Sequence, residues 1–145
     1  MAASQRPGSP RGQLFDTLAR VAARVLRWEG ARRARVELAL LGPTAMRRLN
    51  RRATGRRGLT DVIAFTLPQP DGAILGDVYI CPAAARAFVM GGQADRLREE
   101  LVRLAVHGTL HVLGYDHPDG PGRTRSTMWQ RQERYVRRLM GRRRA

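Results

Sequence analysis

The chain alternates between stretches with helical and stretches with extended spacing of apolar residues. From Leu14 to Trp28 the apolar positions recur at helical spacing, which predicts an amphipathic helix. Apolar residues at every second position from Val36 to Leu40 predict a strand. Gly42–Pro43 interrupts this strand, and Thr44 is expected to be the N-cap of a short helix that reaches about Asn50.

The centre of the chain has the pattern of a β-hairpin followed by a helix. Val62–Leu67 and Ile74–Ile80 are rich in β-forming residues, and residues 68–72 between them include two prolines and an Asp-Gly pair. We expect these two runs to pair as antiparallel strands. Pro82 suits the first position of the next helix, which is expected to end by Gly91–Gly92.

Two further helices complete the pattern. One is expected to open at Asp95, to run to about Leu113 and to stop at Gly114, and the last spans roughly residues 125–140. This order of elements predicts an α/β fold of the α+β kind. A small mixed sheet of three to four strands would pack with about five helices.

Length and composition limit the domain organisation. The 145 residues suffice for one domain but not for two, and 43% hydrophobic residues are enough to fold it. Residues 1–12 are rich in Pro, Gly and Ser, which predicts a disordered leader. We expect residues 13–141 to form a single domain and residues 142–145 to form a basic tail. No apolar stretch has the length of a signal peptide or a membrane span. The single cysteine, Cys81, excludes a disulfide within the chain, so we expect a cytoplasmic protein that does not associate with membranes.

The net charge of +15 is distributed unevenly along the chain. Residues 1–60 carry 14 arginines against three acidic residues, a net charge of +11, and residues 123–145 carry nine against one, a net charge of +8. Residues 61–122 have a net charge of −4. The basic ends predict contact with a polyanion such as RNA, and the acidic centre favours a bound dication.

All three histidines lie inside this acidic segment, within one stretch of eleven residues from His107 to His117. His107 and His111 are four residues apart and therefore face the same side of the predicted helix. Gly114 can adopt the left-handed conformation that ends a helix, which would return the chain so that His117 joins them. Three imidazoles at this spacing predict a metal site at the end of a core helix. The fourth tetrahedral position would be open for water, as in catalytic zinc sites.

The same spacing matches the signature of the metzincin peptidases at the three ligands and at the glycine. Those enzymes need a glutamate as general base directly after the first histidine, where this chain has Gly108. Peptide hydrolysis is therefore disfavoured on chemical grounds.

The run from His107 to His117, with Thr109 and Val112–Leu113 at the variable positions, resembles the signature of the bacterial YbeY family of endoribonucleases. The resemblance continues in order along most of the chain, through Leu49–Asn50, Thr60–Phe65, Leu75–Cys81, Met128 and Glu133. It implies a single-strand-specific, metal-dependent RNA endonuclease with one zinc ion on the three motif histidines. It also implies a role in late maturation of the 3′ end of 16S ribosomal RNA and in ribosome quality control, with the small ribosomal subunit as partner.

Two features depart from the pattern of this family. The family usually has Tyr-Arg at the positions aligned with Ala53–Thr54, and that arginine is thought to contact RNA or to assist catalysis. Neighbouring arginines, for which Arg52 and Arg56 are our candidates, are predicted to contact RNA instead. Family members also tend to begin with a strand before the first helix, whereas the sequence of residues 1–12 has no strand pattern.

Several polar residues admit two interpretations from the sequence. Asp116 is a candidate to orient a ligand imidazole or to transfer a proton, and it could equally cap the turn beside Tyr115. Thr60–Asp61 either caps a turn before the strand or lines a groove for RNA. Cys81, at the end of an apolar strand, is expected to be a small buried hydrophobic residue.

The expected reaction is attack on a phosphodiester by a metal-bound water or by the 2′-hydroxyl of the RNA, while the metal and guanidinium groups offset the charge that develops on phosphorus. Two alternatives stay open at this stage. One is a non-catalytic ribosome-assembly factor whose zinc stabilises the fold while the arginine surface binds ribosomal RNA. The other is a metallohydrolase that acts on a different substrate.

Overall fold

The computed structural model describes residues 8–89 and 94–141. Within these ranges the elements are α1 (Pro10–Trp28), β1 (Ala34–Leu40), α2 (Pro43–Thr54), β2 (Val62–Pro68), β3 (Ile74–Ile80), α3 (Pro82–Phe88), α4 (Ala94–Val112), the short 3₁₀ turn η2 (Arg123–Arg125) and α5 (Thr127–Leu139). The α+β fold with a small mixed sheet is therefore confirmed.

The sheet has the strand order β1-β3-β2. β2 and β3 pair in antiparallel register from Val62 opposite Ile80 to Pro68 opposite Ile74, which confirms the predicted hairpin. β1 runs parallel to β3 on its other side. Three strands, the lower number predicted, form the sheet in the described part of the chain.

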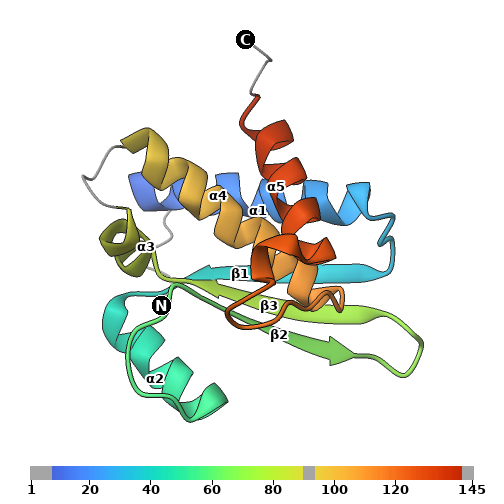
Figure 1. The fold of residues 1–145 in the computed structure, drawn as a ribbon, viewed down its shortest axis with the longest axis horizontal. Helices are drawn as coiled ribbons and strands as arrows, with labels where there is room; N and C mark the ends of the chain where they lie inside the picture. The colour runs from blue at the N-terminus through green and yellow to red at the C-terminus, as the bar shows by residue number, and fades with distance from the viewer. Residues whose placement is uncertain (1–7, 90–93, 142–145) are drawn as a thin grey trace.

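The helices lie on both faces of the sheet. Figure 1 shows α1, α4 and α5 over one face and α2 on the other. The main core lies under the first group, where Val25 of α1, Val78 of β3 and Leu110 of α4 have no exposed surface. On the opposite face a smaller cluster joins Met46 of α2 to Ile63 and Cys81, so the prediction of a buried Cys81 is confirmed.

Two glycines allow α4 to lie very close to the central strand. A Cβ at Gly108 would come within 2.5 Å of the Val78 side chain, and a Cβ at Gly76 within 2.2 Å of Val112. Gly108 of α4 thus packs against Val78 of β3, and Gly76 of β3 packs against Val112 of α4. This contact places the second half of α4, which carries two histidines, directly on the sheet, and it leaves no room for the glutamate that a peptidase would need at position 108.

Several helix ends differ from the sequence predictions. α1 begins at Pro10, earlier than the predicted Leu14, because the Ser9 hydroxyl accepts a hydrogen bond from the Gly12 N–H at 2.9 Å and caps the helix. Pro10–Gly12, assigned to the leader from the sequence, form its first turn.

The prediction of Thr44 as N-cap is wrong. Gly42 occupies that position and Pro43 is the first helical residue, since proline has no N–H that needs an acceptor there. The helix also continues beyond Asn50 to Thr54. α5 begins at Thr127, because the Ser126 hydroxyl accepts from the Trp129 N–H.

Three sequence predictions lie wholly or partly outside the described residues. They concern most of the leader, the end of the third helix at Gly91–Gly92, and the tail at 142–145. Within the described ranges, no helix combines the length and hydropathy needed to cross a bilayer.

Candidate metal centre

The three histidines come together at the carboxyl end of α4, as the sequence predicted. His107 and His111 project from successive turns of this helix, and His117 lies in the loop that follows. Their ring centroids are 4.6, 5.1 and 5.2 Å apart. One ring nitrogen of each lies within 4.8 Å of the other two. In the described part of the chain, this is the group of side chains that could hold a metal ion.

The same nitrogen of each ring is engaged away from the centre. His111 Nδ1 donates to the Tyr115 carbonyl at 2.9 Å and His117 Nδ1 to the Pro118 carbonyl at 3.1 Å. His107 Nδ1 lies 2.7 Å from Gln132 Oε1. Because a carbonyl oxygen can only accept, Nδ1 carries the proton in each ring and Nε2 keeps the lone pair that binds a metal. The donor set therefore fits a divalent ion that prefers imidazole ligands.

Burial keeps the rings of His107 and His111 neutral. His107 is only 8% exposed, and burial together with repulsion from His111, His117 and Arg123 lowers its pKa to about 4, although the bond to Gln132 opposes this shift. Burial also lowers the pKa of His111, with smaller contributions from His117 and Arg123. Since only a neutral imidazole coordinates a metal, two of the ligands are in the binding-competent form at neutral pH.

Gly114 ends the helix and places the third ligand. Its φ is +99°, the left-handed region that favours glycine. The Gly114 N–H donates to the His111 carbonyl at 2.9 Å, and the Tyr115 N–H donates to the Leu110 carbonyl at 3.0 Å. This pair of bonds is the Schellman motif, which satisfies the last helical carbonyls and reverses the chain. The predicted role of Gly114 is confirmed.

A carboxylate from the far end of the sequence holds the loop in place. Glu29, whose side chain is 7% exposed, accepts a hydrogen bond from the Tyr115 hydroxyl at 2.7 Å, another from the Tyr135 hydroxyl, and a third from Arg131 at 2.9 Å. Burial raises the pKa of Glu29, but these three donors outweigh it and leave the pKa below its usual range. The end of α1 thereby fixes the residue whose carbonyl orients His111.

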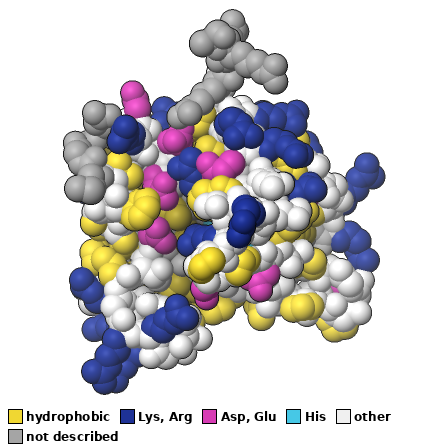
Figure 2. Space-filling view, in the orientation of Figure 1, with side chains coloured by type: hydrophobic (Ala, Val, Ile, Leu, Met, Phe, Trp, Pro, Cys, Tyr) yellow, Lys and Arg dark blue, Asp and Glu magenta, His cyan; other side chains and the backbone are white. Residues whose placement is uncertain are grey.

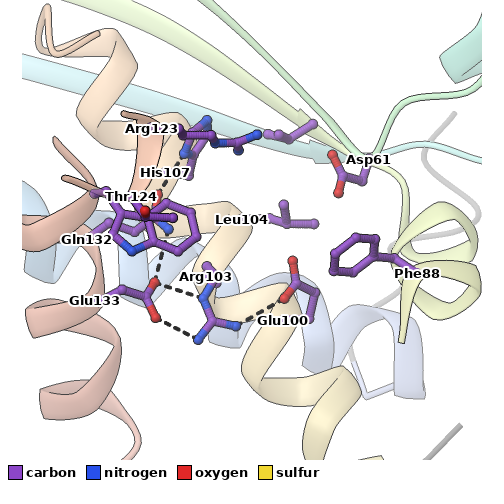
Figure 3. Close-up of a pocket in the computed structure, with 12 residues that line it drawn as sticks. Asp61, Phe88, Glu100, Arg103, Leu104, His107, Arg123, Thr124, Gln132 and Glu133 are labelled. Carbon is purple, nitrogen blue, oxygen red and sulfur yellow. Dashed lines mark hydrogen bonds and ion pairs between the residues drawn. The ribbon is translucent and has the colours of Figure 1, made fainter. Parts of the chain in front are cut away.

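A second network orients His107. Gln132 is 1% exposed, and its Nε2 donates to Glu133 at 3.0 Å, which fixes the amide so that Oε1 faces His107. Arg103 donates twice to the Glu133 carboxylate, at 2.8 and 2.9 Å, and once to Glu100 at 3.0 Å. Figure 3 shows this chain of contacts from His107 to Glu100. Such support holds a ligand ring at a fixed angle.

The structure gives the orienting role to other groups than Asp116. The Asp116 carboxylate accepts from the His117 backbone N–H at 2.8 Å, which is the turn-capping arrangement. The three Nδ1 atoms have Gln132 and two backbone carbonyls as partners instead. Asp116 acts on His111 through its charge, which opposes the fall of that pKa.

Two hollows meet at His107. One, of about 380 Å³, is lined by His107, His111, Thr54, Arg56 and residues of β2. The other, of about 470 Å³, shares His107 and Val62 with the first and is drawn in Figure 3. Arg56 thus borders the candidate metal centre, whereas Arg52 is exposed on α2 outside both sets of lining residues.

The larger hollow brings in residues that the sequence analysis missed. Arg123 lines it, and Arg123 is also among the charges that depress the pKa of His107 and His111. Gln132 lines it too. The sequence held one signal for Gln132, a polar residue midway between Met128 and Val136 on the apolar face of the last helix. For Arg123, one of many arginines, there was no signal.

Arginine side chains surround this face of the molecule. In Figure 2 they lie over α2 and over the upper right around α5, while acidic side chains gather nearer the middle. This agrees with the division of charge along the sequence. A polyanion that approaches this face would meet these cations.

Comparisons with known proteins agree with this site. The family model described as Endoribonuclease YbeY matches residues 10–140. An Endoribonuclease YbeY from Moorella thermoacetica is 38% identical over 133 residues, which cover 82% of this chain and 84% of the relative. One from Bordetella pertussis is 43% identical over 86 residues, or 58% of this chain and 54% of the relative. A solution structure from Thermotoga maritima has a TM-score of 0.60 at 27% identity and covers 92% of this chain and 85% of its own.

The match spans both the histidine motif and the helices that support it, and the relative from Moorella thermoacetica extends over most of either chain. The resemblance noted in the sequence is therefore confirmed. The chain belongs to the YbeY family of endoribonucleases.

Proposed function

We propose that this protein is a zinc-dependent endoribonuclease that cleaves single-stranded RNA at the centre formed by His107, His111 and His117. The observation that carries the proposal is the convergence of three imidazoles, each with Nδ1 engaged elsewhere, in a chain of this family. Three imidazoles suit zinc and leave a coordination position open, as catalytic sites require.

When bound, the ion would supply a Lewis acid that polarises a phosphoryl oxygen. The chain's own residues do the rest. His107, His111 and His117 hold their lone pairs toward one point, while Arg56 in one adjoining hollow and Arg123 in the other provide guanidinium groups that suit phosphate oxygens. The attacking group would be water or the 2′-hydroxyl of the RNA, and Asp116 is the nearby carboxylate proposed to transfer a proton.

The biological part of the proposal concerns ribosomal RNA. The enzyme would act late in maturation of the 3′ end of 16S ribosomal RNA and in ribosome quality control, with the small ribosomal subunit as partner and the cytoplasm as location. The arginine-rich edges supply the sequence-independent attraction that such a substrate needs. The name of the relatives, Endoribonuclease YbeY, supports RNA as the substrate.

The test is cleavage of one single-stranded RNA and of the duplex of the same sequence, with and without chelator, while circular dichroism reports the fold. We expect cleavage of the single strand only, lost on chelation and restored by zinc. His111→Ala should lose cleavage and bound metal together, whereas Asp119→Asn, in the exposed part of the loop, serves as the matched control and should keep both.

Other results would replace the proposal. If chelation unfolds the protein and the zinc form binds RNA without cutting it, the protein is an assembly factor with a structural ion. Turnover of a different ester with indifference to RNA would make it a hydrolase of another class. Full cleavage by metal-free protein would exclude the mechanism.

RNA contact by Arg52 and Arg56 has a separate test in the salt dependence of binding. Each phosphate contact on a single strand contributes about 0.7 to the slope of log affinity against log salt. Arg52→Ala and Arg56→Ala should each reduce the slope by about that amount, while Arg35→Ala on β1 should leave it unchanged. Equal slopes for all three variants would show that neither residue contacts phosphate.

A further inference from the structure

The larger hollow beside the histidines contains three kinds of side chain that together match a nucleotide. It has a volume of about 470 Å³, within the range of about 300–1,000 Å³ typical of small-molecule sites. His107 forms part of its wall, so whatever occupies it lies next to the candidate metal centre. Its other walls come from the start of β2, the end of α3, and α4 and α5.

A cation stands at the side of the hollow nearest the histidines. The Arg123 guanidinium lies 5.7 Å from the Trp129 ring centroid, and its charge acts on His107, His111 and Asp61. A cation beside two metal ligands repels a bound dication. The arrangement becomes favourable when an anion lies between them, and a phosphate group is the anion that an arginine fork matches best.

An aromatic ring and a carboxylate lie across the hollow from this cation. Phe88, at the end of α3, is 71% exposed, so its ring is open to a ligand. Asp61 directly precedes β2, and in Figure 3 its carboxylate and the Phe88 ring face His107, Arg123 and Gln132 from the opposite side. Aromatic rings stack with nucleobases in single-stranded RNA.

The Asp61 carboxylate retains capacity to accept further hydrogen bonds. The N–H groups that lower its pKa are those of its own backbone and of Val62, and burial raises the pKa by more than these bonds and Arg123 lower it. A carboxylate has about four lone-pair positions, so donors from a ligand can still be accommodated. Guanine offers two adjacent N–H donors on its Watson–Crick edge, which match the two oxygens of one carboxylate.

We propose that this hollow is the subsite for a guanine nucleotide beside the reacting phosphate, with the base on Phe88, its Watson–Crick edge on Asp61, and the phosphate on Arg123. The inference rests on the proposed endoribonuclease function and adds a base preference to it. It also accounts for the missing arginine at the Thr54 position, because Arg123 supplies a cation to the same centre from η2, just before α5.

The first experiment measures cleavage of four single-stranded RNAs that are uridine throughout except for one variable nucleotide. Cutting next to guanosine should exceed cutting next to uridine by about fivefold to hundredfold, since a good bidentate contact discriminates by about 1–3 kcal/mol. Asp61→Asn should reduce this ratio toward one. Phe88→Ala should lower kcat/KM by about tenfold or more, as expected for a lost stacking contact.

Matched variants separate the subsite from general effects on charge and folding. Arg125→Ala removes a neighbouring arginine of η2, and Leu67→Ala removes an exposed apolar side chain of β2; neither residue lines the hollow. Both should cleave like the parent protein. Arg123→Ala should lose activity with all four RNAs by a similar factor, because a phosphate contact carries no base information.

The second experiment measures binding of guanosine 5′-monophosphate and uridine 5′-monophosphate to the protein by NMR titration. The guanine nucleotide should bind at least tenfold more tightly and should shift signals of residues around Phe88, and Phe88→Ala should abolish this difference. If no RNA is cleaved, the proposed function fails, and this titration still decides the subsite. Equal cleavage next to every base, or equal binding of both nucleotides, would overturn the inference.

Discussion

The hydrogen bond between His107 and Gln132 gives the sharpest prediction about the metal centre. Gln132→Met keeps the approximate volume of the side chain but removes the acceptor that lies 2.7 Å from His107 Nδ1. His107 is 8% exposed and Gln132 1%, so solvent has little access to replace it. An unsatisfied buried donor costs about 1–3 kcal/mol.

This cost translates directly into metal affinity. Loss of a hydrogen-bond partner behind a ligand typically weakens metal binding about 10- to 100-fold, which corresponds to about 1.4–2.7 kcal/mol and agrees with the cost of the orphaned donor. We expect the Kd for zinc of Gln132→Met to rise by this factor, measured by competition with a chromogenic chelator. Gln130→Met, at an exposed position of the same helix, is the control and should leave the Kd unchanged. Equal zinc affinities of Gln132→Met and the parent protein would refute the role assigned to this amide.

Packing and ionisation at three other positions give measurable outcomes. Gly108→Ala would place a Cβ 2.5 Å from the Val78 side chain, so the free energy of unfolding in urea should fall by about 1–3 kcal/mol, whereas an unchanged value would show that α4 can shift. Glu29→Gln should lower the free energy of unfolding by about 1.5–3 kcal/mol at neutral pH, because Glu29 loses charged hydrogen bonds. Because the pKa of Glu29 is lowered on folding, its contribution is present above its usual pKa and is lost as pH falls through the folded value, so parent and variant should converge in acid; curves that stay parallel would contradict this. In the metal-free protein the pKa of His107 is about 4 against 6.5 unfolded, so stability should fall by at most about 3 kcal/mol between these pH values, and His107→Leu should flatten that dependence.

Features that depend on local chemistry could be predicted from the sequence. Pro82 begins α3 because proline suits a first helical position, and Gly114 ends the helix that carries the histidines because its φ is positive. The pair His107 and His111 could be placed on one helical face for the same reason, since a spacing of four residues fixes their relative direction.

Features that depend on contacts between distant segments could not be predicted from the sequence. Gln132 meets His107 across 25 residues, and Glu29 reaches Tyr115 across 86, and no local pattern encodes either contact. For Asp116 the sequence left two interpretations open, and the contact that decides between orienting a ring and capping the turn is the hydrogen bond that its carboxylate accepts from the adjacent His117 N–H.

X-ray absorption spectroscopy of the zinc-loaded protein, with the metal content measured on the same sample, tests whether the three histidines hold a zinc ion with one open position. We expect one zinc ion per chain, coordinated by three imidazole nitrogens and one oxygen, with one imidazole fewer in His117→Ala. A sulfur ligand, a fourth imidazole, or failure to retain zinc would contradict it.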